Sequence, residues 1–294
     1  MEKRMESVFN VLPEHVNRAL KPFYESLIEE IRIKVGCPIF IYIKNKEHTL
    51  YFNNEIYIAK KEDVDYILKK ATKNSLYAYM EDIKNGFITI DNGHRIGISG
   101  RAVYEDKKLI NIKDISSLNI RCANELKGVY ETVYNKLFKN TDIENTLIIS
   151  PPKCGKTTLL RDLTRLLSKN KNIRLALIDE RDEIASSYMG KDYNDVGIRT
   201  FVLSGYSKDE GFSHAVRCLS PDIIICDEIG DKEDFNIISY AIKRGVKIIA
   251  TLHGDGIYEI QNKKEFNAFK NIVILNKNFE FKIYKYTDGE YVEF

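Results

Sequence analysis

The chain has 294 residues, enough for two domains of about 150 residues each, and its composition (44% hydrophobic, 30% charged) is that of a folded globular protein. Its 45 Lys and Arg residues nearly balance its 43 Asp and Glu residues, which excludes a strongly basic tail protein but leaves room for a local basic groove. No run approaches the roughly 18 apolar residues of a membrane span, and the first residues lack the apolar core of a signal peptide. We therefore expect a cytoplasmic chain, which can still dock onto a membrane partner.

The cysteines argue against zinc and against a disulfide framework. Their number is odd, and no pair has C-x-x-C spacing. We expect reduced, mostly buried thiols at Cys37, Cys122, Cys154, Cys218 and Cys226.

Residues 1–124 predict a smaller α+β domain. The expected elements are a short helix opened by Pro13, a second helix from Pro22 to about Glu29, strands around 31–33 and 39–43, and helices at 61–71 and 76–84. The segment from Phe87 to Arg121 is rich in glycine and β-branched residues, which predicts short strands with tight turns.

Residues 125–294 predict an α/β domain. After a helix at 130–137, short apolar runs recur at 146–149, 175–178, 223–225, 246–250 and 272–275, several of them separated by helix-like stretches. Such runs suit strands that are buried on both faces of a parallel-rich sheet. The tail from Glu280 to Phe294 predicts two strands around a hairpin turn at Thr287-Asp288-Gly289.

The segment that follows the first of these apolar runs predicts a phosphate-binding loop. It reads Ser150-Pro151-Pro152-Lys153-Cys154-Gly155-Lys156-Thr157-Thr158, a Walker A pattern in which Ser150 replaces the first glycine. A strand precedes it, and leucines at helical spacing follow it, so the loop N–H groups and the helix N-terminus face the phosphates together. Lys156 is expected to reach the β- and γ-phosphates of ATP, and the Thr157 hydroxyl to bind Mg²⁺.

A second apolar strand ends in acidic residues of the Walker B type. In Ile223-Ile224-Ile225-Cys226-Asp227-Glu228, Asp227 is expected to hold Mg²⁺ and Glu228 to activate the attacking water as a general base.

Two further strand ends carry polar residues. The run Asp179 to Glu183 fits either a second acidic group near Mg²⁺, with Glu180 as the candidate, or an acidic helix N-terminus. His253 fits either a γ-phosphate sensor or a structural histidine.

Arginines can stabilise the charge that develops during γ-phosphate transfer. Arg217, Arg95, Arg101 and Arg121 are candidates, and each also fits an ordinary surface arginine. A nucleic-acid groove at Arg95 to Arg101 is the rival interpretation. It would need interleaved exposed aromatic residues, which are sparse in that segment, so nucleic acid is not expected as a partner.

The chain resembles the stage III sporulation protein AA ATPases, relatives of the type II and type IV secretion and pilus-retraction ATPases. The motifs that carry the resemblance span nearly the whole chain: Glu29 to Ile33, Gly86 to Ile90, His94 to Gly100, Ile115 to Arg121, Ser150 to Arg161, Ile178 to Arg181, Gly197 to Thr200, Ser220 to Gly230 and Ala250 to Gly254. Lys153 departs from the family, which has a glycine there.

The resemblance implies a RecA-like P-loop domain and a hexameric ring with ATP bound between protomers. Asp179 to Glu183 is similar to the family's aspartate box and Thr251 to His253 to its histidine box. The resemblance favours Arg95, Arg121 and Arg101 as groups that reach the nucleotide. It also implies membrane-embedded stage III channel proteins as partners, on the mother-cell side.

The sequence thus predicts an ATP-hydrolysing motor with ATP and Mg²⁺ as cofactors. A nucleotide-dependent scaffold with little turnover and a single-stranded nucleic-acid motor remain as alternatives.

Overall fold

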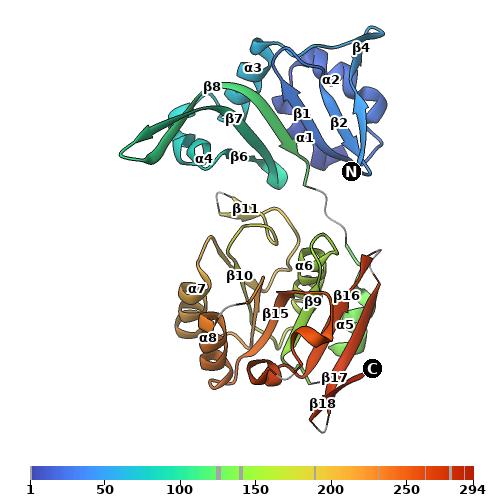
Figure 1. Ribbon diagram of the computed structural model, residues 1–294, viewed down its shortest axis with the longest axis vertical. Coiled ribbons are helices and arrows are strands. Elements are labelled where there is room, and N and C mark those ends of the chain that lie inside the picture. Colours follow the sequence, from blue (N-terminus) through green and yellow to red (C-terminus); the bar gives the residue numbers. More distant parts are fainter. Residues whose placement is uncertain are drawn as a thin grey trace. The chain divides into compact units, whose positions relative to one another are not determined.

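The computed structural model describes residues 2–123, 127–138, 142–188, 190–230, 232–261, 263–277, 280–287 and 289–294. The chain divides into two compact units, Met1–Asn124 and Glu125–Phe294, each with its own main sheet (Figure 1). None of the described helices is long and apolar enough to cross a membrane.

The first unit is an antiparallel sheet with strand order β3-β2-β1-β8-β7-β6, accompanied by helices. Its elements are α1 (Glu2–Val11), α2 (Glu14–Leu20), β1 (Ile28–Lys34), β2 (Phe40–Ile43), β3 (Lys46–Thr49), β4 (Tyr51–Phe52), β5 (Glu55–Ile56), α3 (Lys61–Ala71), α4 (Met80–Lys84), β6 (Phe87–Ile90), β7 (His94–Glu105) and β8 (Lys108–Arg121). Helices α3 and α4 pack against β6 and β8.

Alternation of buried and exposed residues separates the two faces of this sheet in β1, β2, β6 and the parts of β7 and β8 that pair with β6 and β1. Isoleucines and leucines such as Ile31, Ile33, Ile96 and Leu118 are at most 2% exposed, whereas their neighbours along each strand are polar, charged or aromatic and are only partly covered. A period of two is what a strand with one buried face requires.

Several expectations for this unit are wrong in detail. The helix expected from Pro22 to Glu29 is a single 3₁₀ turn at Lys21–Phe23, because β1 begins at Ile28 and its pairing with β2 and β8 takes precedence over the helical pattern. Helix α1 was not anticipated.

The strands expected between Phe87 and Arg121 are longer than predicted. Strands β7 and β8, of 12 and 14 residues, form a hairpin closed by Asp106 and Lys107, whose φ angles of 47° and 62° are those of a two-residue turn that matches the strand twist. At Gly100 the strands come so close that a Cβ would lie 2.5 Å from the Lys113 carbonyl oxygen, so no larger residue fits without a shift.

The second unit is a RecA-like P-loop α/β domain built on a parallel-rich sheet. Its elements are α5 (Glu131–Leu137), β9 (Thr146–Ser150), α6 (Lys156–Leu167), β10 (Leu175–Asp179), β11 (Ser187–Tyr188), β12 (Lys191–Asp192), β13 (Thr200–Ser204), α7 (Lys208–His214), β14 (Ile223–Cys226), α8 (Lys232–Ile242), β15 (Lys247–His253), β16 (Asn271–Leu275), β17 (Phe281–Thr287) and β18 (Glu290–Glu293). The sheet order is β13-β10-β14-β15-β9-β16-β17-β18, parallel as far as β16 and antiparallel beyond it.

Apolar cores form on both faces of this sheet. One core gathers leucines of α6 with residues of α5, and the other gathers residues of α7 and α8. The strands predicted from apolar runs are confirmed, but β13 was missed, and Asp288 of the expected hairpin turn lies outside the described residues.

A buried carboxylate fixes the start of this unit onto α6. Asp162, 1% exposed, accepts hydrogen bonds from the backbone N–H groups of Gly128 (3.0 Å) and Tyr130 (3.1 Å) and pairs with Arg165 (2.9 Å). The Tyr130 hydroxyl in turn donates to the Cys154 carbonyl oxygen at 3.3 Å. The segment that opens the unit therefore supports the loop after β9 directly.

Candidate functional site

The loop after β9 joins a fully buried central strand to the N-terminus of α6. β9 lies between β15 and β16, so its carboxyl end is at the middle of the sheet edge. Gly155 caps α6 with a φ of 96°, a conformation that glycine adopts without strain, and the helix begins at Lys156. Thr157 and Thr158 follow in its first turn. This is the strand–loop–helix order that presents backbone N–H groups to an anion.

Both lysines of the loop have informative geometry. The Lys156 ammonium donates to the carbonyl oxygen of Ser150 at 2.9 Å and reaches that of Pro151 at 3.5 Å, so it folds back across the loop. Lys153 has a φ of 62°, in the left-handed region where a side chain is strained by roughly 1 kcal/mol.

The acidic residues that follow β14 form a compact hydrogen-bonded group with Thr251. Asp227 and Glu228 follow β14, and Thr251 lies on the adjacent strand β15. The Thr251 hydroxyl donates to Asp227 Oδ1 at 2.5 Å and accepts from the Glu228 backbone N–H at 2.8 Å. This bridge fixes Asp227 and Glu228 relative to each other at the carboxyl edge of the sheet.

Glu228 is held in an unusual backbone conformation. Its φ is 37°, in the left-handed region that a glutamate rarely adopts, and its side chain is 48% exposed. Strain of this kind, about 1–3 kcal/mol, persists where surrounding contacts enforce it and is concentrated at functional sites. Here the enforcing contacts are the hydrogen bonds of its backbone N–H to Thr251 and Asp227.

Two residues that follow β10, Glu180 and Arg181, form ion pairs at the same edge of the sheet. The Arg181 guanidinium lies 3.5 Å from Glu228 Oε2, and Lys208 lies 3.3 Å from Glu180 and 3.8 Å from Asp234. Burial lowers the pKa of Lys208, but the carboxylates of Asp234 and Glu180 outweigh it and raise the pKa overall. Glu180 is therefore engaged by a lysine that stays charged.

Asp179 has a structural role. It is 1% exposed, and its carboxylate accepts hydrogen bonds from the backbone N–H groups of Glu183 (2.9 Å), Ile184 (3.1 Å) and Ala185 (2.8 Å). Desolvation raises its pKa, and these hydrogen bonds oppose the rise. Arg161 donates to the carbonyl oxygens of Glu183 and Ile184, so the loop after β10 is fixed from both sides. The segment is a fixed loop, and no helix begins there.

Replacing Asp179 with alanine is expected to destabilise the protein by about 3 kcal/mol or more, because the change leaves buried backbone N–H groups without an acceptor. Urea unfolding of the full chain measures this loss. Glu183→Ala removes an exposed carboxylate from the same loop and should change stability by less than about 0.5 kcal/mol. Equal losses for both variants would contradict the structural role of Asp179.

His253 and Arg217 have different positions relative to the loop. His253 ends β15 and pairs in register with Ser150, so it lies beside the start of the loop. Arg217 lies in the π-helical turn Ala215–Leu219, which precedes β14 and therefore sits at the opposite edge of the sheet. The chain does not bring Arg217 to its own phosphate loop.

The remaining candidate arginines belong to the first unit. Arg95 on β7 pairs in register with Arg121 on β8, and its guanidinium lies over the Phe87 ring at 4.9 Å. Arg101 lies farther along the hairpin, opposite Lys113.

The resemblance included Thr251 in the histidine-box segment without giving it a role, and Tyr130 was not predicted as a site residue. Thr251 is a buried hydroxyl, 0% exposed, near the end of an otherwise apolar strand, and such a group needs a partner. A hydroxyl within an apolar run is the sequence signal for such a contact, but the sequence does not name its partners, Asp227 and Glu228, which follow the neighbouring strand β14. Burial raises the pKa of Tyr130 to about 12, so its hydroxyl remains a proton donor to the loop.

The residues present fit an ATP·Mg²⁺ site. Among the described residues no cluster of three or more His, Cys, Asp or Glu could hold a metal by itself. Mg²⁺ at a phosphate loop does not need one, because it takes few protein oxygens together with phosphates and water. The Thr157 hydroxyl and the Asp227 carboxylate, fixed by Thr251, are such oxygens.

Comparisons with known proteins agree with this architecture. The chain is 36% identical to the stage III sporulation protein AA of Bacillus subtilis, over 88% of this chain and 85% of that one. Its fold is similar to the Legionella pneumophila ATPase DotB (TM-score 0.61, 14% identity, 96% of this chain and 79% of that one) and to the pilus retraction motor PilT (TM-score 0.60, 14% identity, 93% and 80%). The family model for sporulation stage III, protein AA, matches residues 2–285. The chain therefore belongs to the sporulation stage III protein AA family.

Proposed function

We propose that this protein binds ATP with Mg²⁺ and hydrolyses it to ADP and phosphate. Lys156 binds the β- and γ-phosphates, the loop from Ser150 to Thr158 surrounds them, and Thr157 and Asp227 bind the metal ion. Glu228 accepts a proton from the attacking water. The observation that carries the proposal is the Asp227–Thr251–Glu228 bridge, which holds a strained glutamate at the edge where the phosphate loop also ends.

We further propose that the chain acts as an oligomeric motor that powers or assembles a stage III sporulation channel. The solved structures of similar fold are described as an ATPase and as a retraction motor. In a ring, Arg95, Arg101, Arg121 or Arg217 of one copy can serve the nucleotide of another.

The test of the oligomeric motor is steady-state ATP turnover against protein concentration, with light scattering on the same samples. Turnover per chain that rises cooperatively as larger species form, with added ATP promoting assembly, is expected. Turnover per chain that stays constant from monomer to oligomer would contradict a shared site.

The Arg181–Glu228 ion pair favours the second candidate, a scaffold with slow turnover, because it engages the proposed base. Removing it by Arg181→Ala is expected to raise the basal turnover of the full chain up to about five-fold, since an exposed pair contributes at most about 1 kcal/mol. Lys208→Ala, which breaks the Glu180 contact and leaves Glu228 paired, is the matched comparison and should not raise turnover. A drop in turnover for Arg181→Ala would instead assign Arg181 to the reaction.

A further inference from the structure

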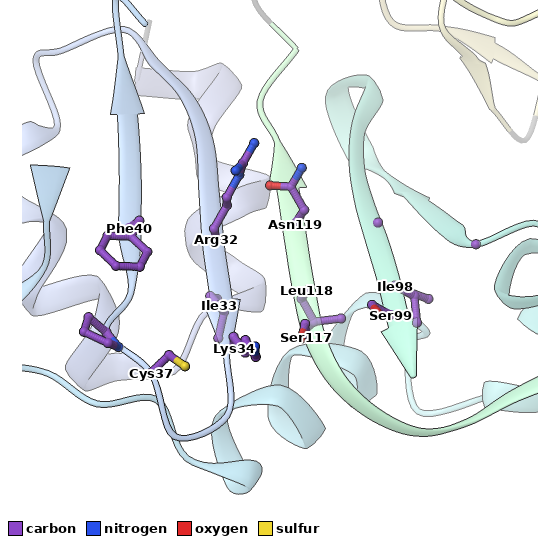
Figure 2. A pocket seen from close by; sticks show the side chains of 13 residues that line it. Arg32, Ile33, Lys34, Cys37, Phe40, Ile98, Ser99, Ser117, Leu118 and Asn119 are labelled. Atoms are coloured by element: carbon purple, nitrogen blue, oxygen red, sulfur yellow. The ribbon is translucent and has the colours of Figure 1, made fainter. Parts of the chain in front are cut away.

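The face of the first unit's sheet opposite the buried isoleucines is basic and aromatic. We call it the open face and define it by Arg32, Lys34, Phe40, Tyr42, Phe87, Arg95, Gly97, Ser99, Ser117, Asn119 and Arg121. Figure 2 looks onto part of it, with helices behind the strands. These residues come from β1, β2, β6, β7 and β8, and their strand neighbours are buried on the other side.

Strand register lines these side chains up in rows. One row runs Phe40, Arg32, Asn119, Gly97, Phe87 across five neighbouring strands, so two aromatic rings lie at its ends and a residue without a side chain lies within it. Because Gly97 adds no side chain, the face is hollowed there.

The hollow has a volume of about 630 Å³. Arg32, Lys34 and Phe40 line it on one side and Ser99, Ser117 and Asn119 on the other, as Figure 2 shows. Asn119 Oδ1 is buried and has no hydrogen-bond partner among the described residues, so an additional donor can be accommodated by a small side-chain adjustment.

The charges on the open face are mainly positive. Arg32, Lys34, Arg95 and Arg121 outnumber Glu47 and Glu30; Glu30 lies on the same face, in register with Tyr42 and Arg121, and accepts hydrogen bonds from Arg32 at 3.0 and 3.1 Å. Two guanidiniums already lie over rings, Arg32 over Tyr42 at 4.6 Å and Arg95 over Phe87 at 4.9 Å. Aromatic rings can stack on nucleobases, and the cations beside them can pair with the phosphates between those bases.

We propose that the open face binds single-stranded RNA, with bases stacked on Phe40 and on the Arg95 guanidinium that covers Phe87, and with phosphates paired with Arg32 and Lys34. The rings of Phe40 and Phe87 are partly exposed, and a sheet face with such rings admits unpaired bases, whereas a duplex hides them. The Ser99 and Ser117 hydroxyls and the Asn119 amide beside the hollow provide partners for the ribose 2′-hydroxyl, which assigns RNA rather than DNA. The segment from Arg95 to Arg101 has few aromatic residues of its own, and the sheet supplies them from β2 and β6.

The test is fluorescence anisotropy of the full chain, without ATP, with a labelled oligouridylate of about ten nucleotides, a length that such stacking grooves cover. We expect saturable binding whose log affinity falls with log salt by about 0.7 per phosphate contacted. Phe40→Ala should weaken binding about ten-fold or more. Arg32→Gln should weaken it and lower the salt slope by about 0.7.

Matched controls lie away from the open face. Tyr77→Ala removes an 86% exposed ring, and Lys69→Gln an exposed cation on α3; both should leave RNA affinity unchanged. Thermal melting checks that each variant is folded. Absence of RNA binding at low salt, or equal losses for Tyr77→Ala and Phe40→Ala, would overturn the proposal. Equal affinity for oligodeoxyuridylate of the same length would overturn the assignment to RNA.

A second copy of the chain is the competing occupant. If Phe40→Ala and Arg32→Gln abolish self-association in light scattering and RNA does not bind, the open face is a contact between copies and the RNA proposal is wrong. None of these substitutions touches the phosphate loop, so failure of this proposal leaves the ATPase proposal standing.

Discussion

Lys156→Ala is expected to weaken ATP binding by about a hundred-fold and to abolish hydrolysis. The ammonium is the charged group that crosses the loop after β9, and charge-assisted hydrogen bonds to phosphate are worth about 1.5–3 kcal/mol each. Isothermal titration with ATP and Mg²⁺ measures the change in affinity. The exposed Lys169, just beyond α6, provides the matched control, and Lys169→Ala should bind ATP like the parent. A Lys156→Ala variant that binds ATP with the parent's affinity would place the nucleotide elsewhere.

Glu228→Gln is expected to preserve ATP binding and to lower the turnover number by about 10²- to 10⁴-fold, the contribution of a general base. Glutamine has the same shape, so the left-handed backbone and its hydrogen bonds to Thr251 and Asp227 are retained. The pair of measurements, affinity by titration and turnover by phosphate release, separates a catalytic role from a binding role.

Glu233→Gln on α8 is the control for Glu228→Gln, because it removes an exposed carboxylate nearby. It should retain the parent's turnover. If Glu228→Gln hydrolyses ATP as fast as Glu233→Gln, another group activates the water, and Glu180 is then the next carboxylate to replace.

Local signals in the sequence predicted much of the fold. The strands of the parallel sheet are short apolar runs, as expected for strands that are buried on both faces. The phosphate loop combines a sequence motif with a strand before it and a helix after it. Helix α3 has the residues expected for it, because its apolar positions recur at helical spacing. In each case the residues that determine the local structure lie close together in the sequence.

The sequence predictions were wrong or incomplete where the structure depends on residues that are far apart in the sequence. The stretch after Pro22 looks helical, yet pairing with β2 and β8 makes Ile28–Lys34 a strand. The run from Asp179 to Glu183 fitted an acid near Mg²⁺, with Glu180 as the candidate, or a helix N-terminus, and the sequence did not predict that backbone N–H groups several residues later occupy the Asp179 carboxylate. Thr251 gains its role from residues on a neighbouring strand. A single sequence does not reveal such partners, since strand order is set by tertiary packing.

The open face shows the same principle at a surface. Phe40, Arg32, Asn119 and Phe87 are far apart in the sequence, and no motif joins them. Register across the sheet places them in one row, and this placement gives the surface its chemistry.

The most direct test of the account is phosphate release from ATP and Mg²⁺ by the parent and by Lys156→Ala, purified in the same way and measured over the same range of protein concentrations. The account predicts release by the parent that rises with assembly and is lost in the variant. Equal release by both proteins would show that the activity does not come from this loop and would contradict the central claim.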